Sequence, residues 1–166
     1  MSKIYLKKID ATIQNQNLSN LAWNLLEQII YQEYKLNIKD LKLSYNAYGK
    51  PYFLNVDFHF NISHSKCLIA IALSKQKIGI DVERIRNLKY PLSFAKKLKV
   101  TSTDSTTIIK RFSALEAYFK KIGTGLIYSQ LQKDIQISYQ TLLTVEKDQY
   151  VLSIDMEDEI EKIYWV

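Results

Sequence analysis

The sequence predicts an α+β fold in which one domain is built from two similar halves. Two segments, 18–34 and 108–122, repeat apolar residues at helical spacing, and each is followed by a glycine-containing turn and by short alternating segments. With 166 residues and 47% hydrophobic content, the chain can close one core but not two ordinary ones. We therefore expect a single domain over residues 1–166, with halves at about 1–90 and 91–166, each a long helix packed on a small antiparallel sheet.

In the first half, the pattern predicts one helix followed by short strands. Ser19 is a candidate N-cap for the helix. Residues 41–44 alternate as a strand that runs into the turn 46–51. Residues 58–63 alternate between apolar and polar side chains, which is typical of a half-buried strand, whereas the continuous apolar run 67–73 predicts a strand covered on both faces.

The second half is expected to contain one long helix, followed by strands. Segment 84–104 resembles a connector, and the helix 108–122 should end at Gly123 and Gly125. One apolar stripe should face the core: Ile108, Phe112, Leu115, Phe119 and Ile122. Short alternating strands are expected at 135–138, 141–145, 150–154 and 160–166.

The composition excludes several classes of protein and favours an anionic partner. The net charge of +6 suits nucleic acid, a phosphorylated small molecule or an acidic protein. The 12 tyrosines lie in apolar-periodic segments, so we expect core packing and no nucleic-acid partner.

The apolar run 67–73 is too short for a bilayer, and residues 1–10 lead into no signal-like stretch, which predicts a cytoplasmic protein without a membrane partner. Cys67 should be a buried free thiol.

Two carboxylates are expected side by side on the strand 78–83. Its apolar residues point to one face, so Asp81 and Glu83 share the other and could bind one divalent cation. The alternative is an ordinary charged strand face exposed to solvent.

Two further features could carry chemistry. Glu116 and Lys120 lie four residues apart on the second helix, and the alternative for them is a surface ion pair. His64 belongs to the polar cluster 61–65, which could bind an anion at the end of a strand, and the alternative is a turn histidine with local hydrogen bonds.

Four motifs occur in the order YGKP, FNISHS, GIDVE and LEAYFKKIGTGL. Over residues 18–126 they resemble the 4′-phosphopantetheinyl transferase superfamily, in particular a shortened form of its surfactin-synthetase-activating type. The resemblance implies a pseudo-twofold duplicated fold with the active site between the halves. It also implies that a monomeric, Mg²⁺-dependent transferase moves 4′-phosphopantetheine from coenzyme A to a serine of an acyl or peptidyl carrier protein and releases 3′,5′-ADP.

The resemblance also implies a role for each matching residue. The metal would be held by three carboxylates, Asp81, Glu83 and Glu116. Glu116 would also be the base for the acceptor hydroxyl, with Asp81 and Lys120 as the other catalytic residues. Coenzyme A would be bound by Lys50, Ser63, His64, Asp81 and Lys120.

The chain departs from the family pattern at two kinds of position. Phe112 and Leu115 stand where the family has Trp and Lys, so Leu115 is expected to remove a charge beside the reacting phosphates. Glu27 stands at a commonly basic position, which leaves lysines of the N-terminal segment to hold the 3′-phosphate: Lys3, Lys7 or Lys8. These departures support one alternative function, a degenerate homologue that binds coenzyme A or carrier protein without transfer.

Overall fold

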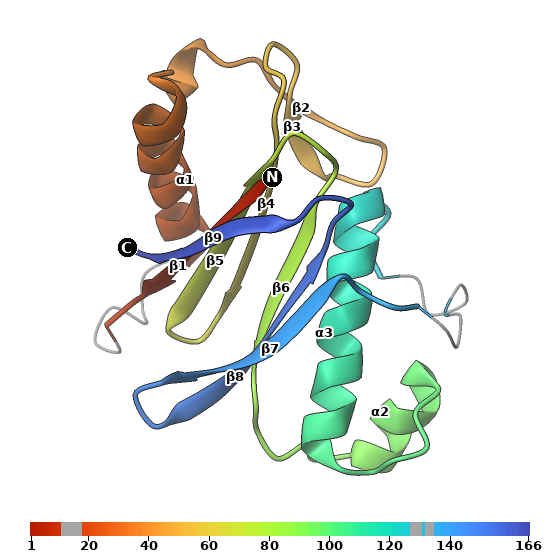
Figure 1. Ribbon diagram of the computed structural model, residues 1–166. Helices are drawn as coiled ribbons and strands as arrows, with labels where there is room; N and C mark the ends of the chain where they lie inside the picture. Colours follow the sequence, from red (N-terminus) through yellow and green to blue (C-terminus); the bar gives the residue numbers. More distant parts are fainter. Residues whose placement is uncertain (11–17, 127–130, 132–134) are drawn as a thin grey trace.

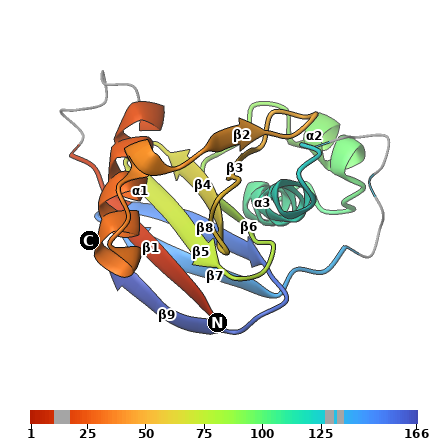
Figure 2. The ribbon, with the colours of Figure 1, turned by 90° about the horizontal axis from the view of Figure 1, so that it is seen from above.

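Two β-sheets face each other across the core, and each carries a long helix on its outer face (Figures 1 and 2). The computed structural model describes residues 1–10, 18–126, 131 and 135–166. Helix α1 (Leu18–Tyr34) covers the first sheet, and α3 (Ser105–Ile122) packs on the second. The α+β class predicted from the sequence is confirmed.

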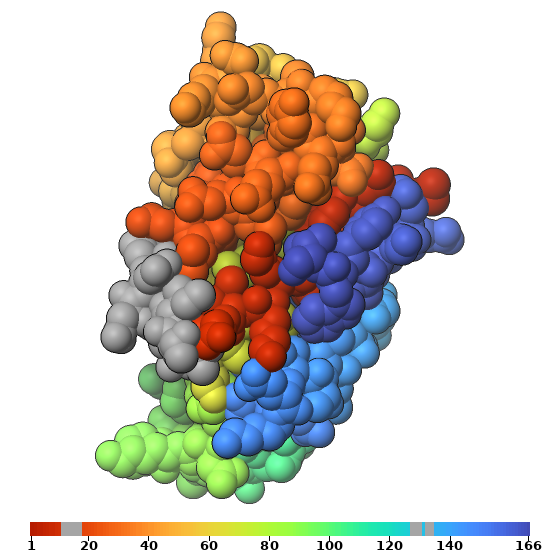
Figure 3. Space-filling model, turned by 90° about the vertical axis from the view of Figure 1, so that its left-hand side faces the viewer, coloured from red at the N-terminus to blue at the C-terminus, as the bar shows by residue number. Residues whose placement is uncertain are grey.

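The first sheet has the strand order β4-β5-β1-β9. Strand β1 (Ser2–Lys8) runs antiparallel to β5 (Leu68–Ser74), which runs antiparallel to β4 (His59–Ser65). On the other side of β1, the strand β9 (Ile160–Trp165) is added in parallel. Figure 3 shows β1 in red and β9 in blue side by side at the surface.

The second sheet has the order β6-β8-β7. Strand β6 (Gly79–Arg84) pairs antiparallel with β8 (Asp148–Asp155), which pairs antiparallel with β7 (Tyr139–Val145). The same arrangement occurs in the first sheet. There β1 lies antiparallel to β5, the second strand of the hairpin β4–β5, just as β6 lies antiparallel to β8, the second strand of the hairpin β7–β8. A short hairpin of β2 (Leu43–Tyr45) and β3 (Pro51–Phe53) follows the 3-10 turn η2 (Ile38–Asp40).

The long helices cover the segments expected of them, but their first turns differ from the prediction. Ser19 lies inside α1 and is therefore not its N-cap. Helix α3 begins at Ser105 because the carboxylate of Asp104 accepts a hydrogen bond from the Thr107 backbone N–H, 2.7 Å away. It ends as predicted at Gly123, whose φ of 80° is left-handed.

Two other predictions in the second half were wrong. The expected connector contains helix α2 (Pro91–Leu98), which begins on a proline and buries Ala95 and Leu98 beside α3. Residues 135–138 form no strand. There Ile135 packs on the α2–α3 cluster, and its carbonyl accepts a hydrogen bond from Arg111 Nη1 at 3.0 Å.

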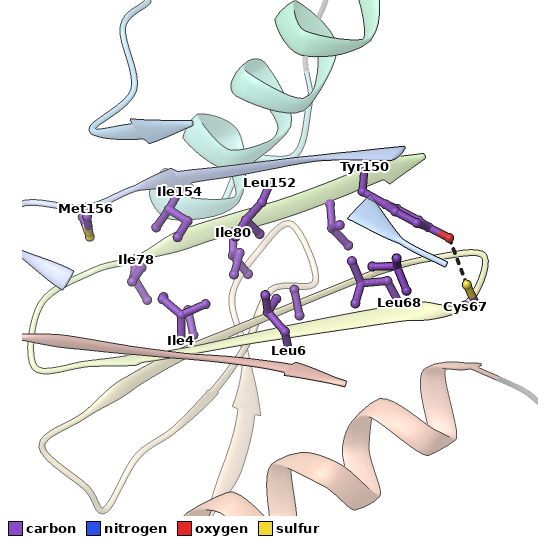
Figure 4. Close-up of a cluster of buried hydrophobic side chains, with 14 residues drawn as sticks. Ile4, Leu6, Cys67, Leu68, Ile78, Ile80, Tyr150, Leu152, Ile154 and Met156 are labelled. Atoms are coloured by element: carbon purple, nitrogen blue, oxygen red, sulfur yellow. Dashed lines mark hydrogen bonds between the residues drawn. The ribbon is translucent and has the colours of Figure 1, made fainter. Parts of the chain in front are cut away.

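The main core lies between the two sheets (Figure 4). Ile4 and Leu6 of β1 belong to one core cluster with Ile80 and Val82 of β6 and with Ile78, which directly precedes β6, as the alternation predicted. The thiol of Cys67 is buried, with its sulfur 3.0 Å from the Tyr150 hydroxyl, so the predicted free buried thiol is confirmed. Within the described residues, no helix has the length and apolar character needed to cross a membrane.

Candidate active site

A cleft of about 360 Å³ opens where the edges of the two sheets meet. Its walls come from α1, β3, β4, β6 and α3. Six of the seven site residues predicted from the sequence line this cleft: Ser63, His64, Asp81, Glu83, Glu116 and Lys120.

Side chains of β4 hold the free edge of β6. Strand β6 is the edge of its sheet, so its outward backbone N–H groups need partners from outside the sheet. The donor–acceptor pairs are Ile80 N to Asn61 Oδ1 (2.8 Å), Val82 N to Ser63 Oγ (3.2 Å) and Arg84 N to Ser65 Oγ (3.1 Å). These three bonds, the β4–β6 ladder, join the two sheets and fix the backbone on both sides of Asp81.

Asp81 is buried, with 3% of its surface exposed. Its Oδ1 accepts hydrogen bonds from Lys120 Nζ at 2.7 Å and from Ser63 Oγ at 3.0 Å. Its Oδ2 is buried without a hydrogen-bond partner among the described residues. The alternative of a solvent-exposed strand face is therefore wrong for Asp81.

Glu83 and Glu116 share the cleft with Asp81, and both are half-buried. Burial, reinforced by Asp81, raises the pKa of Glu83, while Arg86 at 3.2 Å opposes that rise. Burial also raises the pKa of Glu116, helped by the charges of Asp81 and Glu83 and opposed by Lys120. The alternative of a surface ion pair between Glu116 and Lys120 is wrong, because Lys120 pairs with Asp81.

His64 lies within strand β4, opposite Ile69, so it is not a turn histidine. It is exposed and lines the cleft near Lys120. Partial burial, together with the positive charge of Lys120, lowers its pKa. A neutral imidazole at this place can donate or accept a hydrogen bond.

Lys50 is the predicted site residue that the structure places elsewhere. Its ammonium group donates to the carbonyl oxygens of Lys120 at 2.5 Å, Lys121 at 3.2 Å and Ile78 at 3.4 Å. Burial, with help from the charge of Lys77, lowers the pKa of Lys50 to about 8. Lys50 lines a second cleft, together with Tyr52, Phe53 and His59.

Leu115 does not face the cleft. It is fully buried between α2 and α3, in a cluster with Leu98 and Phe119, so the expectation that it removes a charge beside the reacting groups is wrong. Phe112, one turn earlier, does line the cleft.

The N-terminal lysines are engaged away from the cleft. Lys3 pairs with Glu33, and Lys8 pairs with Glu146. Lys7 lies on β1 between them and is not among the described residues that line the cleft.

Two residues of α1 that were not predicted as site residues, Trp23 and Ser19, also line the cleft. The Trp23 ring meets Phe60 edge-on, with the ring centroids 5.7 Å apart. A tryptophan beside polar helix positions was the available signal, because indole combines an apolar body with a polar N–H.

The cleft contains carboxylate oxygens, which are the ligands of a hard cation, but these carboxylates do not converge on one point. Among the described residues, no group of three or more His, Cys, Asp or Glu lies close enough to hold a metal ion. Two of the carboxylates are instead paired with a cation, Asp81 with Lys120 and Glu83 with Arg86. Because Asp81 Oδ2 is buried and unpartnered, and carboxylate oxygens suit Mg²⁺, the residues present fit such a cation.

Comparison with known proteins agrees with the motifs. No family model matches the chain. The chain is 26% identical over 139 residues to the 4′-phosphopantetheinyl transferase gsp of Aneurinibacillus migulanus, covering 75% of this chain and 58% of that protein. It is 32% identical over 114 residues to the 4′-phosphopantetheinyl transferase Sfp of Bacillus subtilis, covering 61% and 50% respectively.

The chain spans about half the length of the curated relatives it matches. The structure defines the class of this protein: it is an α+β protein with a cleft between two sheets, and acidic side chains and a lysine line that cleft. The resemblance drawn from the motifs is confirmed, because the chain is similar to several curated 4′-phosphopantetheinyl transferases.

Proposed function

We propose that the protein transfers 4′-phosphopantetheine from coenzyme A to a serine of an acyl or peptidyl carrier protein and releases 3′,5′-ADP. One observation carries the proposal: Asp81, Glu83, Glu116 and Lys120 line a single cleft. The similarity to proteins named as 4′-phosphopantetheinyl transferases supports a transfer of this kind.

The acidic side chains have two roles in the proposed reaction, as metal ligands and as the base. Asp81, Glu83 and Glu116 would hold Mg²⁺, which supplies positive charge to neutralise the pyrophosphate of coenzyme A. Glu116 is the base in this proposal and accepts the proton of the carrier serine, directly or through a water. Its raised pKa brings it closer to the value a base needs near neutral pH.

The basic side chains act on the phosphates. The serine oxygen forms a bond to the phosphorus that carries pantetheine, and the phosphoanhydride bond to 3′,5′-ADP breaks. Lys120 stabilises the negative charge that develops on the leaving phosphate. His64 orients the phosphates from the exposed end of β4.

We also propose that the fold is a duplicated unit and that the protein is a monomer. The matching orders β1-β5-β4 and β6-β8-β7 support the duplication. The cleft draws on elements of both sheets of one chain, which supports a monomer. Size-exclusion chromatography with light scattering tests this, and a stable trimer would count against it.

The direct test is intact-protein mass spectrometry of apo acyl and peptidyl carrier proteins incubated with the protein, coenzyme A and Mg²⁺. We expect a gain of one phosphopantetheinyl group, which is lost with EDTA and in the Asp81→Ala variant. Lys121→Met is a matched control, because Lys121 pairs with Asp155 outside the cleft. Unmodified carriers despite measurable coenzyme A binding would overturn the proposal in favour of a binding protein without transfer.

A further inference from the structure

An internal ammonium group neutralises the most buried carboxylate of the cleft. Lys120 Nζ lies 2.7 Å from Asp81 Oδ1 and 3.1 Å from Ser63 Oγ. Ser63 in turn donates to the same Asp81 oxygen at 3.0 Å. One oxygen of Asp81 therefore carries both of these bonds.

The other oxygen of Asp81 is left without a partner. Oδ2 is buried and forms no hydrogen bond within the described part of the chain. A buried carboxylate oxygen without a partner carries a desolvation cost, so a ligand that supplies positive charge there gains binding energy. The Lys120–Asp81 pair thus satisfies half of the carboxylate and leaves the other half for a second cation.

Lys120 and a divalent cation would compete for this carboxylate. Two positive charges on one small carboxylate repel each other strongly in a partly buried cleft. Asp81 is fixed, since the β4–β6 ladder binds the backbone on either side of it. Lys120 can leave, because its charge sits on a flexible four-carbon stem and 26% of its side chain is exposed.

Glu116 shares the helix face of Lys120, one turn earlier, and lines the same cleft. Because Lys120 itself lines the cleft, an ammonium group that moves away from Asp81 can remain within the cleft, beside Glu116.

We propose that Lys120 is an internal counter-ion that a divalent cation displaces from Asp81, and that the displaced ammonium then binds the phosphates of the substrate. The inference rests on the proposed function for the identity of the cation and of the anion. It makes the two ligands cooperative: the cation releases Lys120 for the anion, and the anion keeps Lys120 away from the cation site. This coupling must be reciprocal.

Isothermal titration of Mg²⁺ or Mn²⁺ into the full chain, with and without coenzyme A, tests the exchange. In the wild type we expect weak cation binding alone and tighter binding with coenzyme A present. In Lys120→Met the cation alone should bind roughly tenfold more tightly, because no charged hydrogen bond has to be broken. The gain from coenzyme A should largely disappear in that variant.

Two matched variants separate the exchange from a general loss of charge. Lys120→Arg keeps the charge and should retain weak binding of the cation alone. Lys121→Met breaks a similar ion pair with a buried aspartate, Asp155, but outside the cleft, and should leave cation affinity unchanged.

Unchanged or weaker cation binding in a folded Lys120→Met variant would overturn the proposal. So would wild-type cation binding that coenzyme A does not tighten, a measurement that needs no variant. A chain that shows the expected coupling but modifies no carrier protein contradicts the proposed transfer alone. A chain that transfers but shows no change in cation affinity in Lys120→Met contradicts this inference alone.

Discussion

The ammonium nitrogen of Lys50 lies 2.5 Å from the carbonyl oxygen of Lys120, at the C-terminal end of α3. The last carbonyls of a helix have no partner within the helix, and a cation there also meets the negative end of the helix dipole. Lys50 therefore donates hydrogen bonds to the end of the helix that carries Lys120 and Glu116, and its amine is held there rather than in the cleft.

The stability contribution of Lys50 should depend on pH. Its pKa of about 8 in the folded chain is below the ordinary 10.5, so between pH 8 and 10.5 the unfolded chain holds more protons at this position. The free energy of unfolding of the wild type, relative to Lys50→Met, should thus rise as pH increases through this window. Urea unfolding of both proteins at pH 7, 8 and 9.5 measures this difference, and a flat or falling difference would contradict it.

His64→Ala should weaken substrate binding more than chemistry. The imidazole is exposed on the cleft, so its loss removes a hydrogen bond to phosphate and should raise KM for coenzyme A by up to about tenfold, with kcat little changed. His59→Ala is the control, because His59 is on the same strand but lines the second cleft. Steady-state kinetics of the three proteins decides, and a loss confined to kcat would place His64 in the chemical step.

Leu115 should matter for stability and not for charge in the cleft. Leu115→Ala is expected to lower the free energy of unfolding by about 2–5 kcal/mol, because the side chain is fully buried. Leu115→Lys should destabilise further, since it buries an ammonium group, and should not increase transfer. The control is Leu92→Ala, at a position of α2 that is 71% exposed, where the change should stay within about 0.5 kcal/mol. A stable, faster Leu115→Lys enzyme would contradict the burial.

Gly79 sets the distance between β6 and α3. A Cβ at this position would lie 1.9 Å from the Ala117 carbonyl oxygen and 2.5 Å from the Lys121 backbone nitrogen. Gly79→Ala must therefore push α3 away from β6, which should cost about 1–3 kcal/mol or more and also reduce transfer. Thermal unfolding alongside Gly49→Ala checks this: Gly49 has open space around it, so only its left-handed φ of 83° should cost stability there, about 1 kcal/mol. Equal effects of the two changes would show that backbone contact is not the cause.

Patterns local to one element predicted much of this structure. The alternation over Ile78–Glu83 correctly predicted that the apolar side chains face the core and that Asp81 and Glu83 share the opposite face. The apolar run after Cys67 correctly predicted the fully buried strand β5. These signals work because a strand alternates strictly and a central strand is apolar on both faces.

Features that depend on tertiary partners were not predictable in the same way. The helical period placed Leu115 on the apolar face of α3, but it could not show that α2 covers that position. Asn61 and Ser63 look like the solvent side of an alternating strand, whereas they are buried because the edge of β6 needs acceptors. The family resemblance placed Lys50 among the residues that bind coenzyme A. In the structure its ammonium group instead donates to the carbonyl oxygen of Lys120, 70 residues away at the end of α3.

The position of β9 affects how the chain can fold during synthesis. The centre of the first sheet, β1, is made first, but one of its two neighbours consists of residues 160–165. Until the ribosome has released those residues, β1 presents an open hydrogen-bonding edge that another chain could occupy. The first sheet is therefore completed only after translation has passed the second, and the lysines at positions 3, 7 and 8 of the N-terminal segment place charge on that edge during the interval.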